Sequence, residues 1–245
     1  MGAASGTGTA VAADTAGSPG HAAATAALPS ASPPDAQVLS DERLETRWAY
    51  PARKATVYAR PSRFAHRVTN LRLLTEDGFP EIYLVLSRWA DSRGRTWMKV
   101  RLPMRPNGRT GWVRDDALAT LTVVRTMLDI DKKKLRATLY DNGKVVFTAR
   151  IGVGKAGTPT PAGRFWIREK FPVHNVPLYG THAIGTSAYA PTLSDWPGGG
   201  VVGLHGTNQP GLIPGRPSHG CIRLRNADIA RLYRLAPRGT PIHIH

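Results

Sequence analysis

Short runs of alternating apolar and polar residues, separated by turn residues, constrain the fold of this chain more than any other feature. Such alternation is typical of strands that bury one face. Between residues 55 and 118, glycine, proline and asparagine mark the turns between these runs. The strands predicted there are Ala55–Ala59, Glu81–Ser87, Trp97–Leu102 and Gly111–Arg114. We therefore expect a small β-barrel in this region.

A second β-pattern begins at residue 121. Asn142-Gly143 lies between two alternating runs, which is among the stronger signals for a hairpin. Glycine and proline interrupt most of the chain from there to Ser218, which predicts long loops over a β-scaffold. The strands predicted in this half are Leu121–Ile130, Leu135–Tyr140, Lys144–Val153, Phe165–Arg168, Val201–His205 and Thr240–Ile244.

One helix is predicted close to the C-terminal end. Asn226 is suited to the N-cap, and Asp228 complements the helix dipole in the first turn. Pro237 and Gly239 end the helix. The residues that share its apolar face are Ile229, Leu232, Tyr233 and Leu235. With this single helix, the fold class expected for the chain is all-β.

The first 42 residues are rich in Ala, Gly, Ser, Thr and Pro and contain no Lys, Arg or aromatic residue. Such a segment buries too little apolar surface to offset its ordering entropy, so we expect residues 1–42 to be a disordered leader. The domains expected after it are residues 43–120 and 121–245. No signal peptide is evident at Met1, so either export information is missing from this sequence or the protein is cytoplasmic. No run approaches the roughly 20 apolar residues of a membrane span.

The part of the chain after residue 42 is strongly basic. It holds all 33 Lys and Arg but only 13 of the 17 acidic residues, which gives a formal charge of +20. Such a surface attracts polyanions, and nucleic acid is one candidate. The sequence shows no helix-turn-helix, zinc-finger spacing or ribonucleoprotein motif, which argues against that partner. A basic surface that is only solvated stays an alternative.

The chain has one cysteine, Cys221, which excludes an intramolecular disulfide and a zinc site built on several thiolates. It follows Ser218-His219-Gly220, and a second His-Gly pair stands at His205-Gly206. A nearby His or cation makes a thiol nucleophilic, and Gly220 lets a bulky acyl group approach the sulfur. This combination predicts acyl transfer through a thioester. The alternative is a small buried hydrophobic side chain.

The order His205-Gly206, then Ser218-His219-Gly220-Cys221, resembles the catalytic domain of the L,D-transpeptidases. The resemblance spans about residues 121–245. It extends to three other segments and the closing strand, which are Asn142-Gly143-Lys144, Thr158–Phe165, Tyr179-Gly180 and Gly239–Ile242. Thr158–Phe165 is itself expected to be a structural turn that reverses the chain at the sheet edge. In the first domain, Trp97–Val100 with the turn at Asn107-Gly108 resembles a bacterial SH3-like fold, although the aromatic residues could be the core of any small β-domain.

The resemblance implies that Cys221 is the nucleophile and His205 the general base. Backbone N–H groups of His219, Gly220 and Cys221 would line the oxyanion region, with Ser218 and Gly206 in support. Some members carry a serine directly after the base. With Gly206 there, only a backbone carbonyl is left to orient His205.

Two further positions are expected to bind substrate. Tyr179-Gly180 would line the acyl-donor site, although Tyr179 in the core is the alternative. Arg223 would stabilise the thiolate or bind a substrate carboxylate, although a surface salt bridge is the alternative. His243 and His245 have a spacing that can bind zinc on a strand, but the sequence identifies no third or fourth ligand, so no metal is predicted.

The implied reaction is cross-linking of peptidoglycan stem peptides, with no metal or organic cofactor. Cys221 would attack the carbonyl of an L-centre, a terminal D-residue would leave, and an amine of a neighbouring stem would accept the acyl group. An L,D-carboxypeptidase that uses water is one rival, and a non-catalytic wall-binding protein is another. The expected partners are stem peptides and anionic cell-wall polymers, without nucleic acid, and the expected location is extracytoplasmic.

Overall fold

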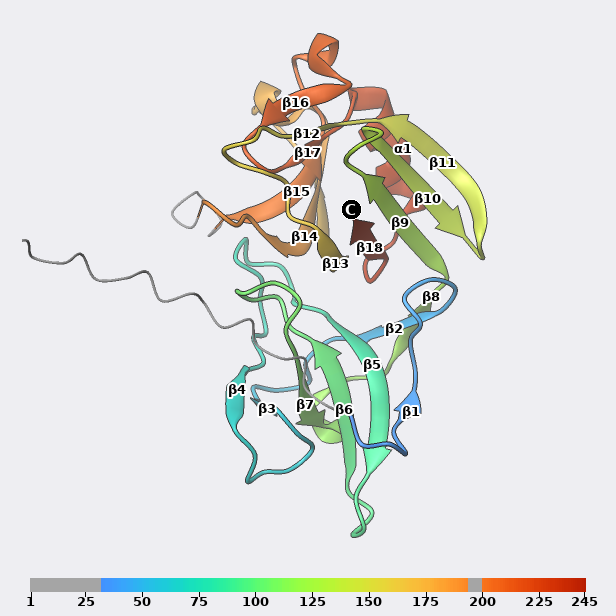
Figure 1. The fold of residues 1–245 in the computed structure, drawn as a ribbon, viewed down its shortest axis with the longest axis vertical. Coiled ribbons are helices and arrows are strands. Elements are labelled where there is room, and N and C mark those ends of the chain that lie inside the picture. The colour runs from blue at the N-terminus through green and yellow to red at the C-terminus, as the bar shows by residue number, and fades with distance from the viewer. Residues whose placement is uncertain (1–31, 194–199) are drawn as a thin grey trace, which may run out of the picture.

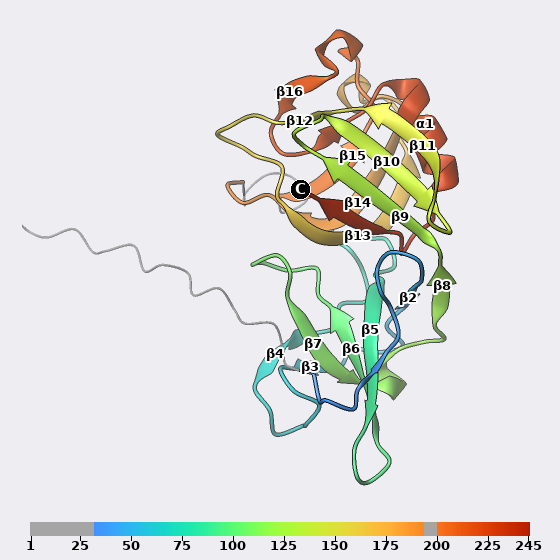
Figure 2. The same ribbon diagram turned by 45° about the vertical axis from the view of Figure 1, so that its right-hand side comes forward.

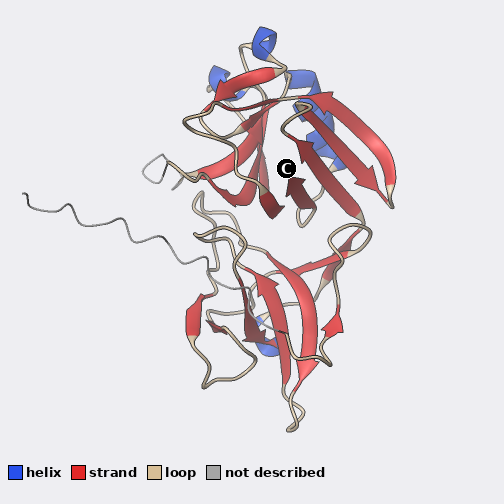
Figure 3. Ribbon diagram, viewed as in Figure 1, coloured by secondary structure: helices blue, strands red, loops and turns tan. Residues whose placement is uncertain are grey.

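The computed structural model describes residues 32–193 and 200–245. The described chain is mostly β-structure with a single α-helix, as Figure 3 shows. Its strands form two sheets, one above the other along the long axis of the molecule (Figure 1). We call them the N-terminal sheet and the C-terminal sheet. No helix in the described ranges is long and apolar enough to cross a bilayer.

The N-terminal sheet has the strand order β4-β3-β7-β6-β5-β2-β8, with β1 paired to β5, and all its pairs are antiparallel. Its strands are β1 (Gln37–Val38), β2 (Thr46–Ala49), β3 (Thr56–Tyr58), β4 (Arg67–Asn70), β5 (Tyr83–Ala90), β6 (Thr96–Arg101), β7 (Thr110–Arg114) and β8 (Thr122–Val124), with a short 3-10 helix at Asp115–Ala117. Each of the four strands predicted here overlaps one of these strands. The core includes Val57, Tyr83 and Val100, which are fully or almost fully buried.

Part of the segment that we expected to be a disordered leader, residues 1–42, packs on the N-terminal sheet. Residues 1–31 lie outside the described ranges, but Gln37–Val38 pairs with Arg88 and Ser87 of β5. The Glu42 carboxylate then accepts a hydrogen bond of 2.5 Å from Arg101 Nε. Residues 37–42 therefore pack on the N-terminal sheet. Their polar composition concealed this because β1 is short and both its residues are exposed.

The C-terminal sheet has the order β11-β10-β9-β18-β13-β14-β15-β17-β12-β16. Its strands are β9 (Thr126–Asp131), β10 (Arg136–Asp141), β11 (Lys144–Arg150), β12 (Gly152–Gly154), β13 (Gly163–Pro172), β14 (His182–Tyr189), β15 (Val201–His205), β16 (Gly215–Ser218), β17 (Ile222–Arg223) and β18 (Pro241–Ile244). The helix α1 (Asn226–Leu235) packs against β14 and β15, and two 3-10 helices lie at Pro177–Tyr179 and Pro210–Leu212. In Figure 2, β18 lies between β9 and β13.

Two strands predicted as continuous are each divided. Leu121–Ile130 separates at Arg125 into β8, which pairs with β2, and β9, which pairs with β10 and β18. The chain thus passes from one sheet to the other inside a single alternating run. Lys144–Val153 separates in the same way at Ile151 into β11 and β12. Alternation records which side chains are buried and does not record which strand is the partner.

The segment that we expected to consist of loops contains the central strand β14. Its last six residues are all buried, although several of them are small or polar, such as Gly185, Thr186 and Ser187. Hydrogen bonds satisfy the hydroxyl groups, as in the bond from Thr186 Oγ1 to Val202 O. A strand buried on both faces does not alternate, so its sequence carries no strand pattern.

A separate apolar cluster lies between the two sheets and joins them. It contains Trp48, Ile82, Leu84 and Val124 of the N-terminal half together with Trp166 of β13. Trp166 Nε1 donates a hydrogen bond of 3.1 Å to Ile82 O. The cluster buries large side chains of both sheets against each other, so the two sheets share a core.

Arg168 crosses the same interface and is only 1% exposed. Its guanidinium forms a two-pronged pair with the fully buried Glu81 carboxylate, in which Nε lies 2.9 Å from Oε1. Glu76 Oε2 lies 2.9 Å from Arg168 Nη1 on another side. Burial opposes ionisation of Glu76, but Arg168 outweighs it and lowers the Glu76 pKa to about 2. Both partners of Arg168 come from the N-terminal half.

Replacing Glu81 with Ala should lower the free energy of unfolding of the whole chain by about 3–5 kcal/mol, because a buried cation loses a partner. Urea denaturation measures this loss. The matched control is Glu45→Ala, which removes exposed ion pairs to Arg47 and Arg125 and should cost about 1 kcal/mol or less. Equal small losses for the two variants would contradict the importance of the interface.

Candidate active site

The parallel pairing of β15 with β17 brings the two His-Gly motifs together. Leu204 pairs with Ile222, and His205 pairs with Arg223. Leu204 and Ile222 are fully buried in the core, so their neighbours along each strand point to the opposite face. His205, Cys221 and Arg223 therefore share one side of the sheet, although Cys221 lies 16 positions after His205 in the sequence.

Ser218 holds the turn that precedes the thiol. Its Oγ donates a hydrogen bond of 2.6 Å to the Cys221 carbonyl and accepts one of 3.1 Å from the Gly220 N–H. Gly220 has a φ of 129°, a conformation that favours glycine. The support expected of Ser218 is therefore visible in its contacts. The Gly220 N–H differs from expectation, because it binds Ser218 and is not available to an oxyanion in this conformation.

Thr160 supports the same turn and was not among the predicted site residues. Its Oγ1 donates a hydrogen bond of 2.7 Å to the Gly220 carbonyl and accepts one of 2.9 Å from the Gly154 N–H. Thr160 is 2% exposed and belongs to Thr158–Phe165, which we expected only to reverse the chain. The sequence around Thr160 does not indicate that its hydroxyl binds Gly220, which lies 60 residues further along the chain.

His205 ends β15 and is 4% exposed. Its Nδ1 lies 2.6 Å from the Gly206 carbonyl oxygen, so Nδ1–H donates and Nε2 keeps its lone pair. The expected backbone acceptor for the imidazole is thus Gly206. Burial lowers the pKa of His205 to about 4, and Arg223 adds to this, while the bond to Gly206 opposes it.

The thiol of Cys221 is also held in its neutral form. Burial raises its pKa, against the smaller opposing effects of the Gly203 backbone and Arg223. A neutral thiol therefore lies beside a neutral imidazole near pH 7. Arg223 Nη1 lies 3.4 Å from Gln209 Oε1, and no carboxylate in the described ranges lies within ion-pair distance of it. The salt-bridge alternative for Arg223 thus has no partner among these residues.

Tyr179 and Gly180 contact the base from the other side. The Tyr179 ring meets the His205 ring edge to face, with centroids 4.6 Å apart. Gly180 has a φ of 67°, and a Cβ there would lie 2.1 Å from Asn226 Oδ1. Only glycine therefore fits next to Tyr179, and the half-buried Tyr179 lies at the site and outside the apolar core cluster.

Asn226 is not the N-cap that the sequence predicted. The N-cap is Arg225, which makes no side-chain capping bond, and Asn226 is the first residue of α1. Asn226 Oδ1 instead accepts a hydrogen bond of 2.9 Å from the Thr207 N–H. It also packs where a side chain at Gly206 would lie. Asn226 therefore fixes the loop that follows His205.

Two cavities meet at the thiol. One has a volume of about 290 Å³ and is lined by Leu193, His219 and Arg223. The other has a volume of about 550 Å³ and extends past Phe171 and His174 to Asp77 of the N-terminal half. The four residues that line both cavities are Tyr179, Val201, His205 and Cys221. The exposed His219 thus lines the smaller of these two cavities and does not line the larger one.

The N-terminal half also holds one wall of the smaller cavity. Asn107 donates a hydrogen bond of 2.8 Å to Tyr189 O and accepts one of 3.0 Å from Tyr189 N. Arg105 Nη2 donates to the carbonyls of Ala190 and Leu193, at 3.3 and 3.0 Å. Ala190 and Leu193 line the cavity at Cys221. Hydrogen bonds from the N-terminal half therefore hold the backbone at the end of β14 and directly after it.

Residues 125–244 match the family described as the L,D-transpeptidase catalytic domain. YkuD of Bacillus licheniformis, which carries an L,D-transpeptidase name, is 35% identical over 120 residues, 49% of this chain and 64% of that protein. YbiS of Escherichia coli, also named as an L,D-transpeptidase, is 31% identical over 131 residues, 46% of this chain and 42% of that protein. The chain thus spans less than two thirds of the length of these relatives.

Among solved structures, the catalytic domain of the E. faecium L,D-transpeptidase is 26% identical with a TM-score of 0.37, over 49% of this chain and 96% of that one. The family match includes both His-Gly motifs and the strands that hold them. Residues 125–244 of this chain are therefore similar to L,D-transpeptidase catalytic domains.

The pKa values of His205 and Cys221 can be measured separately. His205 should titrate with a midpoint of about 4 by NMR, because burial disfavours the imidazolium. The rate of alkylation of Cys221 should keep rising with pH beyond the pKa of an ordinary thiol, because the pKa of Cys221 is raised. Arg223→Ala should raise both pKa values, because the guanidinium lowers each of them. Arg216→Ala, at an exposed arginine of β16, is the control. A thiol that is fully ionised at pH 7 would contradict this arrangement.

Proposed function

We propose that this protein is an L,D-transpeptidase in which Cys221 is the nucleophile and His205 the general base. The observation that carries the proposal is the pairing of β15 with β17, which places the only thiol beside a neutral imidazole on one cavity wall. The match of residues 125–244 to the L,D-transpeptidase catalytic domain supports the reaction class.

In the first step, the Cys221 thiol gives its proton to His205 Nε2 while the sulfur attacks the carbonyl of the L-centre. The bond from Nδ1–H to the Gly206 carbonyl stabilises the imidazolium that forms. His205 then gives the proton to the amine of the terminal D-residue, which leaves as the C–N bond breaks. A thioester on Cys221 remains.

The oxyanion of this step needs hydrogen-bond donors. The Gly220 N–H binds Ser218, so we assign the oxyanion to the N–H of Cys221 and to the backbone at His219. Thr160 and Ser218 hold the turn that presents these groups. His219 would then act through its backbone and through the cavity wall, and not as a base.

In the second step, an amine of a neighbouring stem attacks the thioester, loses a proton to His205 and releases Cys221. The two cavities on either side of the thiol offer separate places for the acyl donor and the amine. Tyr179 lines both, and Arg223 offers a cation to a substrate carboxylate. Water in place of the amine would give the L,D-carboxypeptidase reaction. The mostly apolar lining of both cavities favours the amine, because it gives water few partners.

We further propose that the N-terminal half is an SH3-like module that binds wall polymer, and that the protein acts outside the cytoplasm, where its substrate lies. The basic charge of the chain supports contact with anionic polymer. The units that we propose are residues 37–124 and 126–245, because the chain changes sheet at Arg125. The bonds from Asn107 and Arg105 give the module a second role in shaping the site.

Mass spectrometry after incubation with a tetrapeptide stem tests the chemistry. The chain should gain one acyl group, and Cys221→Ala should gain none while it stays folded. His205→Ala should slow acylation by roughly 10²–10⁴. His219→Ala should slow it less, because its side chain takes no proton. Acylation that survives in Cys221→Ala would remove the proposed nucleophile, and equal losses for the two histidine variants would remove the assignment of the base.

Asn107→Ala tests the role of the N-terminal half. It removes both bonds to the Tyr189 backbone, so the wall at Ala190 should move and acylation should slow by up to about 10²-fold. The control is Asn70→Ala, which removes an exposed bond to Thr56 and should leave the rate unchanged. Equal acylation rates for both variants would show that the module does not shape the site.

A further inference from the structure

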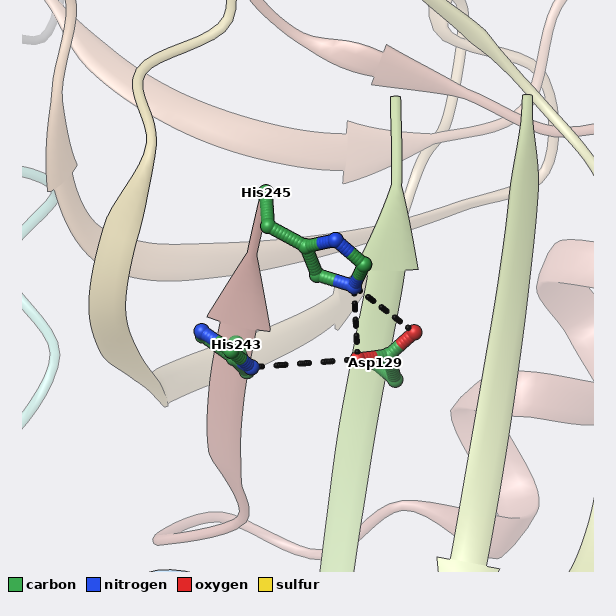
Figure 4. Close-up of side chains that lie close together, drawn as sticks. All are labelled: Asp129, His243 and His245. Carbon is green, nitrogen blue, oxygen red and sulfur yellow. Dashed lines mark hydrogen bonds and ion pairs between the residues drawn. The ribbon is translucent and has the colours of Figure 1, made fainter. Parts of the chain in front are cut away.

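Three metal-ligating side chains lie together on the outer face of the C-terminal sheet. In the parallel pair of β18 and β9, His243 pairs with Asp129 and Ile244 pairs with Ile130. The two isoleucines are buried in the core, so Asp129, His243 and His245 point to the other face (Figure 4). None of these three residues lines the cavities at Cys221.

The distances within this group fit a bound ion. His245 Nε2 lies 3.1 and 3.3 Å from the two oxygens of Asp129, and His243 Nδ1 lies 3.9 Å from Oδ1. One ligand atom from each residue lies within 4.8 Å of the other two. Ligands at zinc distances in a tetrahedron lie about 3.3 Å apart. Small rotations of the side chains would therefore bring all three atoms onto one ion.

The backbone around these residues is fixed on both sides. His245 N donates a hydrogen bond of 3.0 Å to Ile130 O, and Lys132 N donates one of 2.9 Å to His245 O. The pairing of the two strands thus continues past the end of β18. Ligands on paired strands keep their spacing better than ligands on loops.

A surface ion pair accounts for part of this group but not for all of it. His245 and Asp129 are within hydrogen-bond distance, whereas His243 Nδ1 is too far from the carboxylate for a hydrogen bond. The His243 ring nevertheless lies close to that of His245, with centroids 5.1 Å apart.

A cavity of about 300 Å³ opens beside the group, between the C-terminal sheet and the segment Glu42–Leu44. Asp129 and His243 line it, and so do Arg43 and Arg164. Three protein ligands leave a fourth position of a tetrahedral ion open. The two arginines would complement an anionic ligand in that position.

We propose that Asp129, His243 and His245 bind one divalent transition-metal ion, of which Zn²⁺ is the type, with an open position facing this cavity. Two imidazoles and one carboxylate are the ligand set that suits zinc. The sequence offered the two histidines without a further ligand, and parallel pairing supplies Asp129 from 114 residues earlier in the chain. The proposal does not depend on the transpeptidase reaction.

Calorimetric titration of the full chain with Zn²⁺ tests this site. Cys221 and His205 could bind zinc by themselves, so the titration uses the Cys221→Ala chain as background. One ion per chain should bind. His243→Ala and Asp129→Asn should each weaken binding at least about tenfold, the loss expected when even a supporting partner is removed. His66→Ala, at an exposed histidine of the N-terminal half, should bind as the background does.

Cobalt gives an independent measurement. Co²⁺ in the same background should show the strong visible absorption of a four-coordinate site, and His243→Ala should lose it while its thermal unfolding stays unchanged. Absence of binding in the Cys221→Ala chain would overturn the proposal. Binding that is equal in Asp129→Asn, His243→Ala and His66→Ala would overturn it as well.

Discussion

The parallel pairing of β15 with β17 is the constraint on which the site depends. Successive residues of β15 and β17 point to opposite faces of the sheet, and Leu204 and Ile222 point into the core. His205, Cys221 and Arg223 are then left on the face of the cavities. A shift of one residue in this register would bury the charged Arg223 and expose the core, so packing and site geometry are fixed together.

Around this pair, hydrogen bonds from distant segments fix the groups that strand pairing leaves free. Thr160 and Ser218 hold the turn before the thiol, and Asn226 holds the loop after His205. The Gly206 carbonyl takes the place of an orienting side chain. Burial then keeps both the thiol and the imidazole neutral. In the proposed mechanism, such a pair would form its charges only during proton transfer, beside backbone groups that are already held in place.

The N-terminal sheet is part of this arrangement. A buried Arg168 binds two carboxylates across the interface, and Trp166 fills an apolar cluster that both sheets share. The carboxylates that pair with Arg168, and the apolar side chains that cluster with Trp166, belong to the N-terminal half. Asn107 extends the contact to the cavity wall. The interface thus ties the stability of the catalytic domain and the shape of its cavity to the first half of the chain.

Local sequence patterns were enough to predict the all-β class, α1, the hairpin at Asn142-Gly143 and the motif around Cys221. These features depend on neighbours in the chain, such as alternation, turn conformation and the residues next to a thiol. Other features are visible only in the folded chain: the point where the chain changes sheet, the central position of β14, and the contact of Asn226 with a loop instead of a helix cap. The proximity of Asp129 to His243 and His245 is another such feature. Each of these depends on which strands pair and on what a buried polar atom finds there, and local sequence patterns do not encode contacts between residues so far apart in the chain.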